Sequence, residues 1–346
     1  MTEPMIDLNQ AQLEESLRTG AELIPFEPHP LLKNGHVQTI AAAWLSGADV
    51  DGKSAASHIV DLPDGDQLVV HDNEPKDWTP GDPVTLLMHG LCGSSASVYM
   101  SRIASKLNDR GHRTFRINQR GCGDGLGMSQ FPYHAGRSAD LGAVVEYVMT
   151  LSPDSPINVV GFSLGGNIVL KWLGEDPESL PAKLTHAVAV NPPADLQQCT
   201  ESLVSPVGRV YDRHFARLLH RQALDTPRWH DYIPEEWSSR GPRRILEFDD
   251  LLTAPVGGFD SAADYYRQSS AARVLGDIRV PTLILTSRND PLIPIDTIEC
   301  LPRSNSVHLH VSTSGGHLGY VGRRGSGDPD RHWMDWRVVD WLTSAK

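Results

Sequence analysis

The chain alternates between short apolar runs and longer stretches in which apolar residues recur at helical spacing. The apolar runs have the length and composition of buried strands, and they span residues 84–88, 113–118, 157–161, 186–191, 282–287 and 307–312. Between them, apolar residues at steps of three and four predict amphipathic helices. One such set is Met100, Ile103, Ala104 and Leu107. Strands that are apolar on both faces and separated by such helices predict an α/β fold, with a mostly parallel central sheet flanked by helices.

Two parts of the chain depart from this alternation. Residues 1–55 have a polar start followed by an irregular, proline-rich stretch, so we expect an N-terminal arm there. Residues 197–270 hold helical patterns rich in aromatic residues and arginine but no buried strand, which predicts a helical cap inserted between two late strands. Residues 56–196 and 271–346 then form the α/β core, which opens with a hairpin around Pro63-Asp64-Gly65.

The composition is that of an ordinary soluble globular protein, with 40% hydrophobic and 21% charged residues. The formal net charge is −12 and no basic run occurs, so neither nucleic acid nor an anionic membrane is an expected partner. The four cysteines are far apart and form no zinc motif, which favours reduced thiols in a cytosolic protein. Because no signal peptide and no apolar run of about 18 residues is visible, we expect a cytoplasmic protein without an integral membrane segment.

A serine lies at the junction of a predicted strand and a predicted helix. The apolar residues 157–160 are followed by Gly161-Phe162-Ser163-Leu164-Gly165-Gly166 and then by a helical stretch. The pattern G-x-S-x-G in this context is typical of a nucleophile held on a sharp strand-to-helix turn, where glycines let the backbone fold tightly. Ser163 is therefore the candidate nucleophile, and the alternative is a tight turn with an incidental serine.

An earlier loop supplies candidates for stabilising an oxyanion. The predicted strand 84–88 leads into His89-Gly90-Leu91-Cys92, and in proteins with such a serine turn one oxyanion donor comes from a loop of this kind. We expect the backbone N–H groups of Leu91 and Leu164 to form the oxyanion hole. His89 precedes the serine in the chain, so we expect it to shape the loop through a hydrogen bond. No partner motif supports a thiol mechanism at Cys92.

The acid and the base are expected after the serine, in the order Ser, Asp or Glu, His. Asp290 follows the predicted strand 282–287, and His317 follows the strand 307–312 on a glycine-rich loop. Both positions are at the C-terminal ends of strands, where open α/β sheets build their sites. Other acids and histidines do not combine this position with this order, and they are Asp249, Asp250, Asp296, His308, His310 and His332. His308 and His310 share a strand face but have no acidic cluster nearby, so we expect no metal site.

Taken together, these features resemble the α/β-hydrolase fold over roughly residues 55–345. Four further segments are similar to the YheT-like branch of that family, namely residues 28–40, 118–123, 248–259 and 265–267. This branch includes fungal medium-chain ethyl-ester synthase/esterases and mammalian abhydrolase-domain phospholipases. The resemblance implies action on acyl esters and does not fix a substrate.

Two of these segments have alternative interpretations. Residues 28–40 either place His36 near the site or form an arm that braces the cap. The segments Phe248-Asp249-Asp250 and Tyr265-Tyr266-Arg267 either bind a substrate headgroup or hold the cap onto the sheet. In the cap, a stripe at about four-residue steps predicts an amphipathic helix facing the sheet, part of which lines an acyl tunnel. The stripe consists of Leu203, Val207, Tyr211, Phe215, Leu218 and Leu219.

The sequence therefore predicts a serine esterase for small-molecule esters with short-to-medium acyl chains. Ser163 would attack the ester carbonyl, His317 would accept and return the proton, and Asp290 would orient His317. We expect no metal and no other cofactor, since no dinucleotide or P-loop motif occurs. Two alternatives stay open, which are an acyltransferase that uses the same residues and a non-catalytic binding protein of the same fold.

Overall fold

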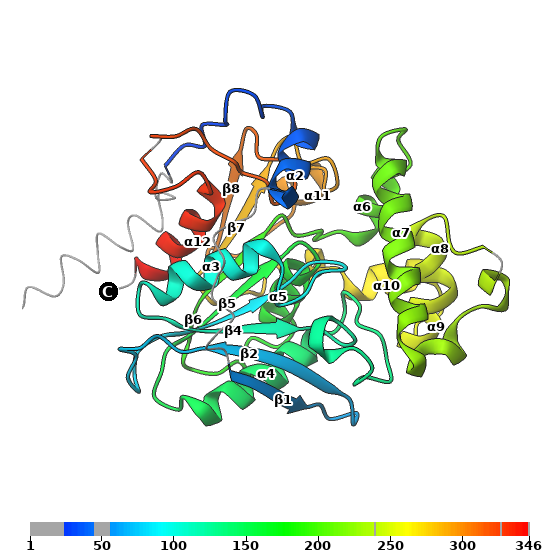
Figure 1. Ribbon diagram of the computed structural model, residues 1–346, viewed down its shortest axis with the longest axis horizontal. Coiled ribbons are helices and arrows are strands. Elements are labelled where there is room, and N and C mark those ends of the chain that lie inside the picture. Colours follow the sequence, from blue (N-terminus) through cyan, green and yellow to red (C-terminus); the bar gives the residue numbers. More distant parts are fainter. Residues whose placement is uncertain (1–23, 45–55, 239, 326, 345–346) are drawn as a thin grey trace, which may run out of the picture.

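A computed structural model of the protein describes residues 24–44, 56–238, 240–325 and 327–344. At its centre is an eight-stranded sheet with the order β1-β2-β4-β3-β5-β6-β7-β8 (Figure 1). The hairpin β1/β2 and the pair β2/β4 are antiparallel, and the other neighbours are parallel. The strands are β1 Ala56–Asp61, β2 Gln67–Asn73, β3 Val84–Met88, β4 Arg113–Asn118, β5 Ile157–Phe162, β6 Leu184–Val190, β7 Thr282–Ser287 and β8 Val307–Ser312.

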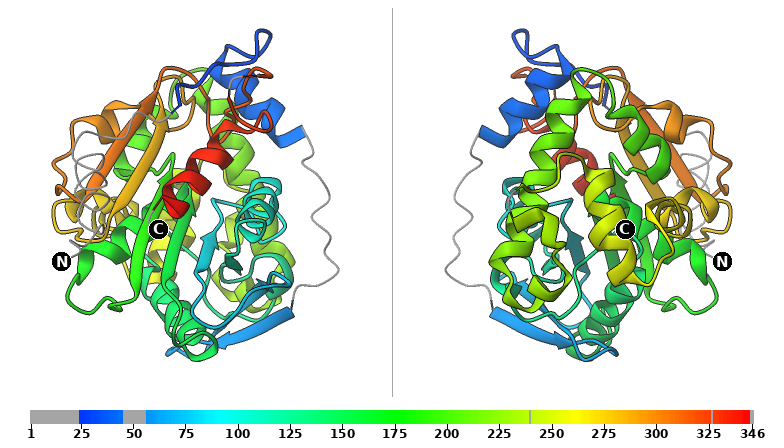
Figure 2. Two further views of the ribbon diagram at one scale, coloured as in Figure 1. Left: turned by 90° about the vertical axis from the view of Figure 1, so that its left-hand side faces the viewer. Right: turned by 90° about the vertical axis from the view of Figure 1, so that its right-hand side faces the viewer.

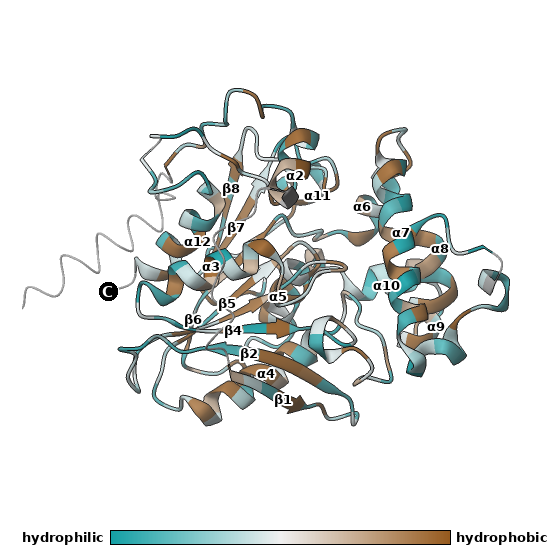
Figure 3. Ribbon diagram, in the orientation of Figure 1, coloured by the Kyte–Doolittle hydropathy of each residue, from teal (hydrophilic) through white to brown (hydrophobic). Residues whose placement is uncertain are grey.

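Helices cover both faces of the sheet because successive strand residues point to opposite sides. Leu86 and Val159 pack against α4 (Ser138–Leu151) and α5 (Leu164–Glu175). Their neighbours Leu87 and Val160 pack on the other face, against α3 (Val98–Asn108) and α12 (Trp333–Thr343). Figure 3 shows the hydrophobic colouring concentrated in the strands, while the helices carry hydrophilic residues as well. The predicted fold class, a mostly parallel sheet flanked by helices, is confirmed.

The chain between β6 and β7 forms the helical cap, which lies to the right of the sheet in Figure 1. Its helices are α6 Leu196–Ser202, α7 Gly208–Asp225, α8 Ile245–Phe248, α9 Ala254–Gly257 and α10 Ala262–Ser269, with a π-helical turn at Asp249–Thr253 and 3₁₀ turns at Pro227–Tyr232, Glu235–Ser238 and Ala271–Arg273. Elsewhere the chain adds a 3₁₀ turn at Gly123–Gly125 and the short helix α11 at Asp296–Glu299. No helix in the described ranges is long and apolar enough to cross a membrane.

The predicted stripe of the cap does not form one continuous helix. Helix α6 ends at Ser202, with Leu203 as its C-cap, and α7 begins only at Gly208, whose N–H donates to the Ser205 hydroxyl. Val207 precedes α7 and is 51% exposed, so it faces solvent instead of the sheet. The stripe prediction is wrong at this end because Pro206, which lacks an N–H group, separates the two helices.

The described part of the N-terminal arm, residues 24–44, is fastened to the C-terminal part of the chain. Its helix α2 (Gly35–Trp44) lies beside the segment that precedes α12 (Figures 1 and 2). The buried Gln38 side chain accepts from the N–H of Val321 at 2.7 Å and donates to its carbonyl at 3.2 Å. Residues 1–23 and 45–55 of the predicted arm lie outside the described residues.

Candidate active site

Ser163 lies at the tip of a sharp turn between β5 and α5. Its backbone has φ +50° and ψ −120°, a conformation that non-glycine residues rarely adopt. A side chain on Gly161 would come within 2.2 Å of the Gly165 carbonyl oxygen, and one on Gly165 within 2.5 Å of the Met88 carbonyl oxygen. The sequence therefore needs glycine on both sides of the serine. Strain at one residue that the surrounding structure holds in place is a feature of functional sites.

The three residues predicted as nucleophile, acid and base lie in one hydrogen-bonded chain. His317 Nε2 is 2.9 Å from Ser163 Oγ, and His317 Nδ1 is 2.8 Å from Asp290 Oδ2. They follow β5, β7 and β8, so the parallel strands deliver them to the same edge of the sheet. The side chain of Asp290 is fully buried and that of His317 is 9% exposed. With Nδ1–H donated to the carboxylate, Nε2 is the nitrogen that can take the hydroxyl proton.

Asp290 is held by three further hydrogen bonds. The N–H groups of Leu292 and Ile293 donate to its Oδ1 at 2.8 and 3.0 Å. The Asn191 amide donates to Oδ2 at 2.7 Å, and Tyr320 OH in turn donates to Asn191 Oδ1 at 3.1 Å. Asn191 was not among the residues predicted for the site from the sequence. A signal was available, because Asn191 is a polar residue directly after a buried strand, at the same sheet edge as the other site residues.

The N-terminal arm also reaches the site. The backbone N–H of His317 donates to Thr39 Oγ1 at 2.9 Å, which fixes the loop that carries the imidazole. No sequence signal indicated Thr39, because the two residues are 278 positions apart. His36 stacks on Tyr211 of α7 with ring centroids 5.7 Å apart, and its Nδ1 lies 3.0 Å from the Tyr211 hydroxyl. This contact agrees with the interpretation that the segment 28–40 braces the cap.

Two backbone N–H groups beside Ser163 are available to a ligand. On the loop after β3, the N–H of Gly90 donates to Tyr99 OH and that of Cys92 donates to Tyr133 OH. The N–H groups of Leu91 and Leu164 donate to no other group in the part of the chain that the structure describes. Both residues line the pocket that Ser163 and His317 also line. Free backbone N–H groups beside a nucleophile are the kind of donor that can stabilise an oxyanion.

The side chain of His89 holds this loop from behind. His89 Nδ1 donates to the Gly90 carbonyl at 2.7 Å, and its Nε2 accepts from the N–H of Gln119 at 3.2 Å. Burial lowers the pKa of His89 to about 4, so the ring is neutral, as these bonds require. The expectation that His89 shapes the loop is thus confirmed by its contacts. Burial also raises the pKa of Cys92 to about 12, so its thiol stays protonated.

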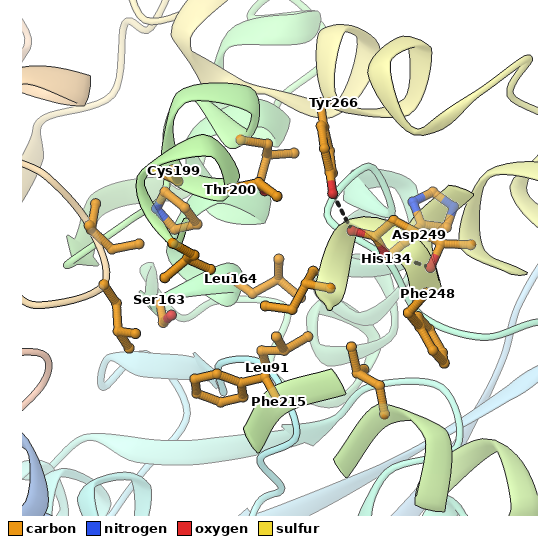
Figure 4. Close-up of a pocket in the computed structure, with 18 of the residues that line it drawn as sticks. Leu91, His134, Ser163, Leu164, Cys199, Thr200, Phe215, Phe248, Asp249 and Tyr266 are labelled. Carbon is orange, nitrogen blue, oxygen red and sulfur yellow. Dashed lines mark hydrogen bonds between the residues drawn. The ribbon is translucent and has the colours of Figure 1, made fainter. Parts of the chain in front are cut away.

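The pocket in front of Ser163 lies between the core and the cap (Figure 4). Its walls are mainly aliphatic and aromatic, and they include Leu91, Leu164, Leu196, Leu203, Phe215, Leu219, Phe248, Leu292 and Ile293. Its polar lining comes from His134, Thr200, Asp249, Thr253, Tyr265 and Tyr266. A mostly apolar pocket with a few placed polar groups is typical of a small-molecule site.

We found no group of three or more potential metal ligands among the described residues. His308 packs against Trp341 and His310 against Trp333, with ring centroids 5.3 and 5.7 Å apart. These two histidines therefore fill space under α12. Asp296, another acid considered from the sequence, begins α11 and does not line the pocket.

An eight-stranded, mostly parallel sheet with a serine turn after β5, a carboxylate after β7 and a histidine after β8 defines the α/β-hydrolase class. A family profile described as "alpha/beta hydrolase fold" matches residues 83–323, and the chain belongs to this family. Within it, the chain is 32% identical over 290 residues to "Putative esterase YheT" of Escherichia coli (strain K12), which covers 82% of this chain and 84% of that protein.

Other relatives agree with this branch of the family. The chain is 26% identical to "Medium-chain fatty acid ethyl ester synthase/esterase 2" of Saccharomyces cerevisiae, over 79% of this chain and 64% of that one. A solved esterase from Pyrococcus furiosus superposes with a TM-score of 0.54 at 18% identity, covering 85% of this chain and 91% of the other, and shows the fold alone. The resemblance to YheT-like proteins is confirmed, and the relatives support hydrolase activity.

Proposed function

We propose that this protein is a serine esterase that cleaves carboxylic esters through Ser163, His317 and Asp290. The observation that carries the proposal is the unbroken chain from Ser163 Oγ through the imidazole to the buried carboxylate, at the wall of an apolar pocket. An imidazole that contacts both a hydroxyl and a carboxylate is the arrangement that activates a serine nucleophile.

The reaction follows from this geometry in two halves. Ser163 Oγ attacks the ester carbonyl while His317 Nε2 takes its proton, and Asp290 stabilises the resulting imidazolium. The N–H groups of Leu91 and Leu164 bind the oxyanion, and removing one such donor typically costs about 3–4 kcal/mol. His317 then returns the proton to the departing alcohol, which leaves an acyl group on Ser163. Water, deprotonated by His317, releases the acid and restores the serine.

A second outcome shares the first half of this reaction. If an alcohol instead of water attacks the acyl group on Ser163, the product is a new ester, and the protein acts as an acyltransferase. The name of the yeast relative, a synthase as well as an esterase, favours keeping this candidate. Comparing free acid with new ester formed in the presence of added ethanol separates the two reactions.

The lining of the pocket supports a proposal for the substrate class. Its aliphatic and aromatic walls favour an acyl chain over a charged group, and relatives are named for activity on esters. We therefore propose esters of short-to-medium acyl chains as substrates. A non-catalytic binding protein would have no need for a serine held in a strained turn against an imidazole.

Labelling with a fluorophosphonate probe tests the proposal directly, because the probe reacts only with an activated serine. We expect wild type to be labelled at Ser163, and Ser163→Ala to lose the label together with about 10⁴–10⁶-fold of ester hydrolysis. Ser179→Ala removes an exposed serine whose hydroxyl only bonds Asp176, and it is expected to behave as wild type. Unchanged labelling or turnover in purified Ser163→Ala would refute the assignment.

A further inference from the structure

The side chains that line the pocket in front of Ser163 differ between its two sides. Figure 4 shows Ser163 and Asp249 on opposite sides of the pocket, with Leu91 and Leu164 drawn between them. Around Asp249 the lining includes the polar side chains of His134, Thr253 and Tyr266, next to the ring of Phe248 (Figure 4). A carboxylate therefore lies in the part of this apolar pocket that is remote from the nucleophile.

Asp249 is buried, with 7% of the residue exposed. Tyr266 OH donates to its Oδ2 at 2.7 Å, and Thr253 Oγ1 donates to its Oδ1 at 2.8 Å. No lysine, arginine or histidine in the described ranges forms an ion pair with it. Burial, with Asp212 and Asp250 as neighbouring like charges, raises the pKa of Asp249 to about 6.

These contacts leave acceptor capacity on a residue that lines the pocket. Each oxygen of an ionised carboxylate can accept two hydrogen bonds, and each oxygen of Asp249 receives one from a side chain. A methyl-terminated acyl chain that reached this part of the pocket would displace water from the carboxylate and offer no donor in return. Leaving a buried acceptor without its partner is unfavourable. A hydroxyl group at the same position would donate and also pack against the pocket wall.

We infer that Asp249 is a specificity residue that accepts a hydrogen bond from a hydroxyl group of the substrate. The favoured substrates are then esters with a hydroxyl several bonds away from the scissile carbonyl. The hydroxyl can belong to the acyl part or to the alcohol part, and the chemistry that Asp249 recognises is the same. This inference rests on the proposed esterase function and narrows its substrate class.

A purely structural role makes a different prediction. Asp249, Thr253 and Tyr266 all belong to the cap, so their hydrogen bonds also tie α10 to the π-helical turn. If that were their whole role, replacing Asp249 would change stability and would lower the activity on all esters alike. Only a recognition role changes the ratio between two esters that differ in one hydroxyl.

The experiment compares matched pairs of esters. In the first arm, p-nitrophenyl esters of roughly four to eight acyl carbons, a span suited to such a pocket, are used with and without a terminal hydroxyl. In the second arm, propyl butyrate is compared with 3-hydroxypropyl butyrate by acid release. The readout is the ratio of kcat/KM for the hydroxylated and plain members of each pair. The proteins are wild type, Asp249→Asn and the control Asp250→Asn, whose exposed carboxylate accepts from the Ala262 N–H outside the pocket.

We expect wild type and Asp250→Asn to favour the hydroxylated member by about tenfold or more in one arm, which identifies the part that carries the hydroxyl. Asp249→Asn is expected to bring that ratio close to one. A wild-type ratio at or below one in every pair overturns the inference, as does an Asp249→Asn ratio equal to that of Asp250→Asn. If Asp249→Asn does not fold, the wild-type ratios decide alone. Failure of the esterase proposal is distinguishable, since then no ester is cleaved and the fluorophosphonate probe does not label Ser163.

Discussion

The amide of Asn191 donates to Oδ2 of Asp290 at 2.7 Å, and this is the same oxygen that faces Nδ1 of His317. Asn191 has φ +46°, a left-handed conformation that asparagine tolerates better than most residues. Together with the N–H groups of Leu292 and Ile293, it fixes the carboxylate before any substrate binds. We regard Asn191 as a positioning residue for the proposed reaction.

Asn191→Gly removes this hydrogen bond and keeps the backbone conformation accessible. A hydrogen bond to a charged group contributes about 1.5–3 kcal/mol, so we expect kcat to fall about 10- to 100-fold with little change in KM. Steady-state kinetics on one p-nitrophenyl ester measure both quantities. A rise in KM of about 10- to 100-fold with unchanged kcat would show that Asn191 acts on substrate binding instead. No change in either constant would show that Asn191 does not position the carboxylate.

A second prediction concerns the close approach of the oxyanion loop to the nucleophile. A side chain on Gly90 would lie 2.9 Å from Ser163 Cβ, closer than two such atoms can approach. Gly90→Ala therefore has to displace Ser163 or the loop, and a shift of this size costs about 100-fold in rate. Gly276→Ala is the control, because a side chain there meets nothing within 4 Å. Equal rates of probe labelling in the two variants would contradict the geometry described above.

The acyl preference can be measured with unsubstituted p-nitrophenyl esters. Each added methylene that finds room in the pocket contributes about 0.8 kcal/mol, which raises kcat/KM by up to about fourfold per carbon. We expect the values to rise from acetate to medium chains and then to fall once the pocket is full. Phe215 of α7 lines the pocket, so Phe215→Ala should move the maximum to longer chains. A profile that peaks at acetate in both proteins would exclude an acyl pocket here.

A fourth prediction follows from the raised pKa of Asp249. The pKa rises from 3.8 to about 6 on folding, so between these values the folded chain binds more protons than the unfolded chain. The free energy of unfolding therefore falls as the pH rises through this window, by about 3 kcal/mol. Asparagine does not titrate, so the stability of Asp249→Asn relative to wild type should improve from about pH 4 to about pH 7. Urea unfolding at both pH values measures this difference, and parallel pH profiles for the two proteins would contradict it.

Features that depend on local order in the sequence could be predicted from it. The strand, the turn with Gly161 and Gly165, and the position of a polar residue after a strand are all properties of short segments. For this reason Ser163, Asp290 and His317 could be named as candidates, and the sheet then brings them into one hydrogen-bonded chain. The fold class followed from the same alternation of strands and helices.

Contacts between distant segments could not be predicted in the same way. Thr39 contacts His317 although 278 positions separate them in the chain, and Tyr266 contacts Asp249 from a different cap helix. Such pairs have no spacing signal, because only the three-dimensional packing brings them together. The start of α7 was also missed, since a stripe of apolar residues continues through Pro206 although the helix does not.

The bond between Thr39 Oγ1 and the backbone of His317 has a consequence for the order of assembly. During synthesis, the turn at Ser163, the whole cap and all eight strands of the sheet are made before His317. The loop that carries His317 gains this anchor only when it docks onto the N-terminal arm, a contact between residues 278 positions apart. Contacts of such high sequence separation form slowly during folding. During refolding, ester turnover should therefore recover later than the sheet structure. The time at which activity returns then reports when the contact between Thr39 and His317 forms.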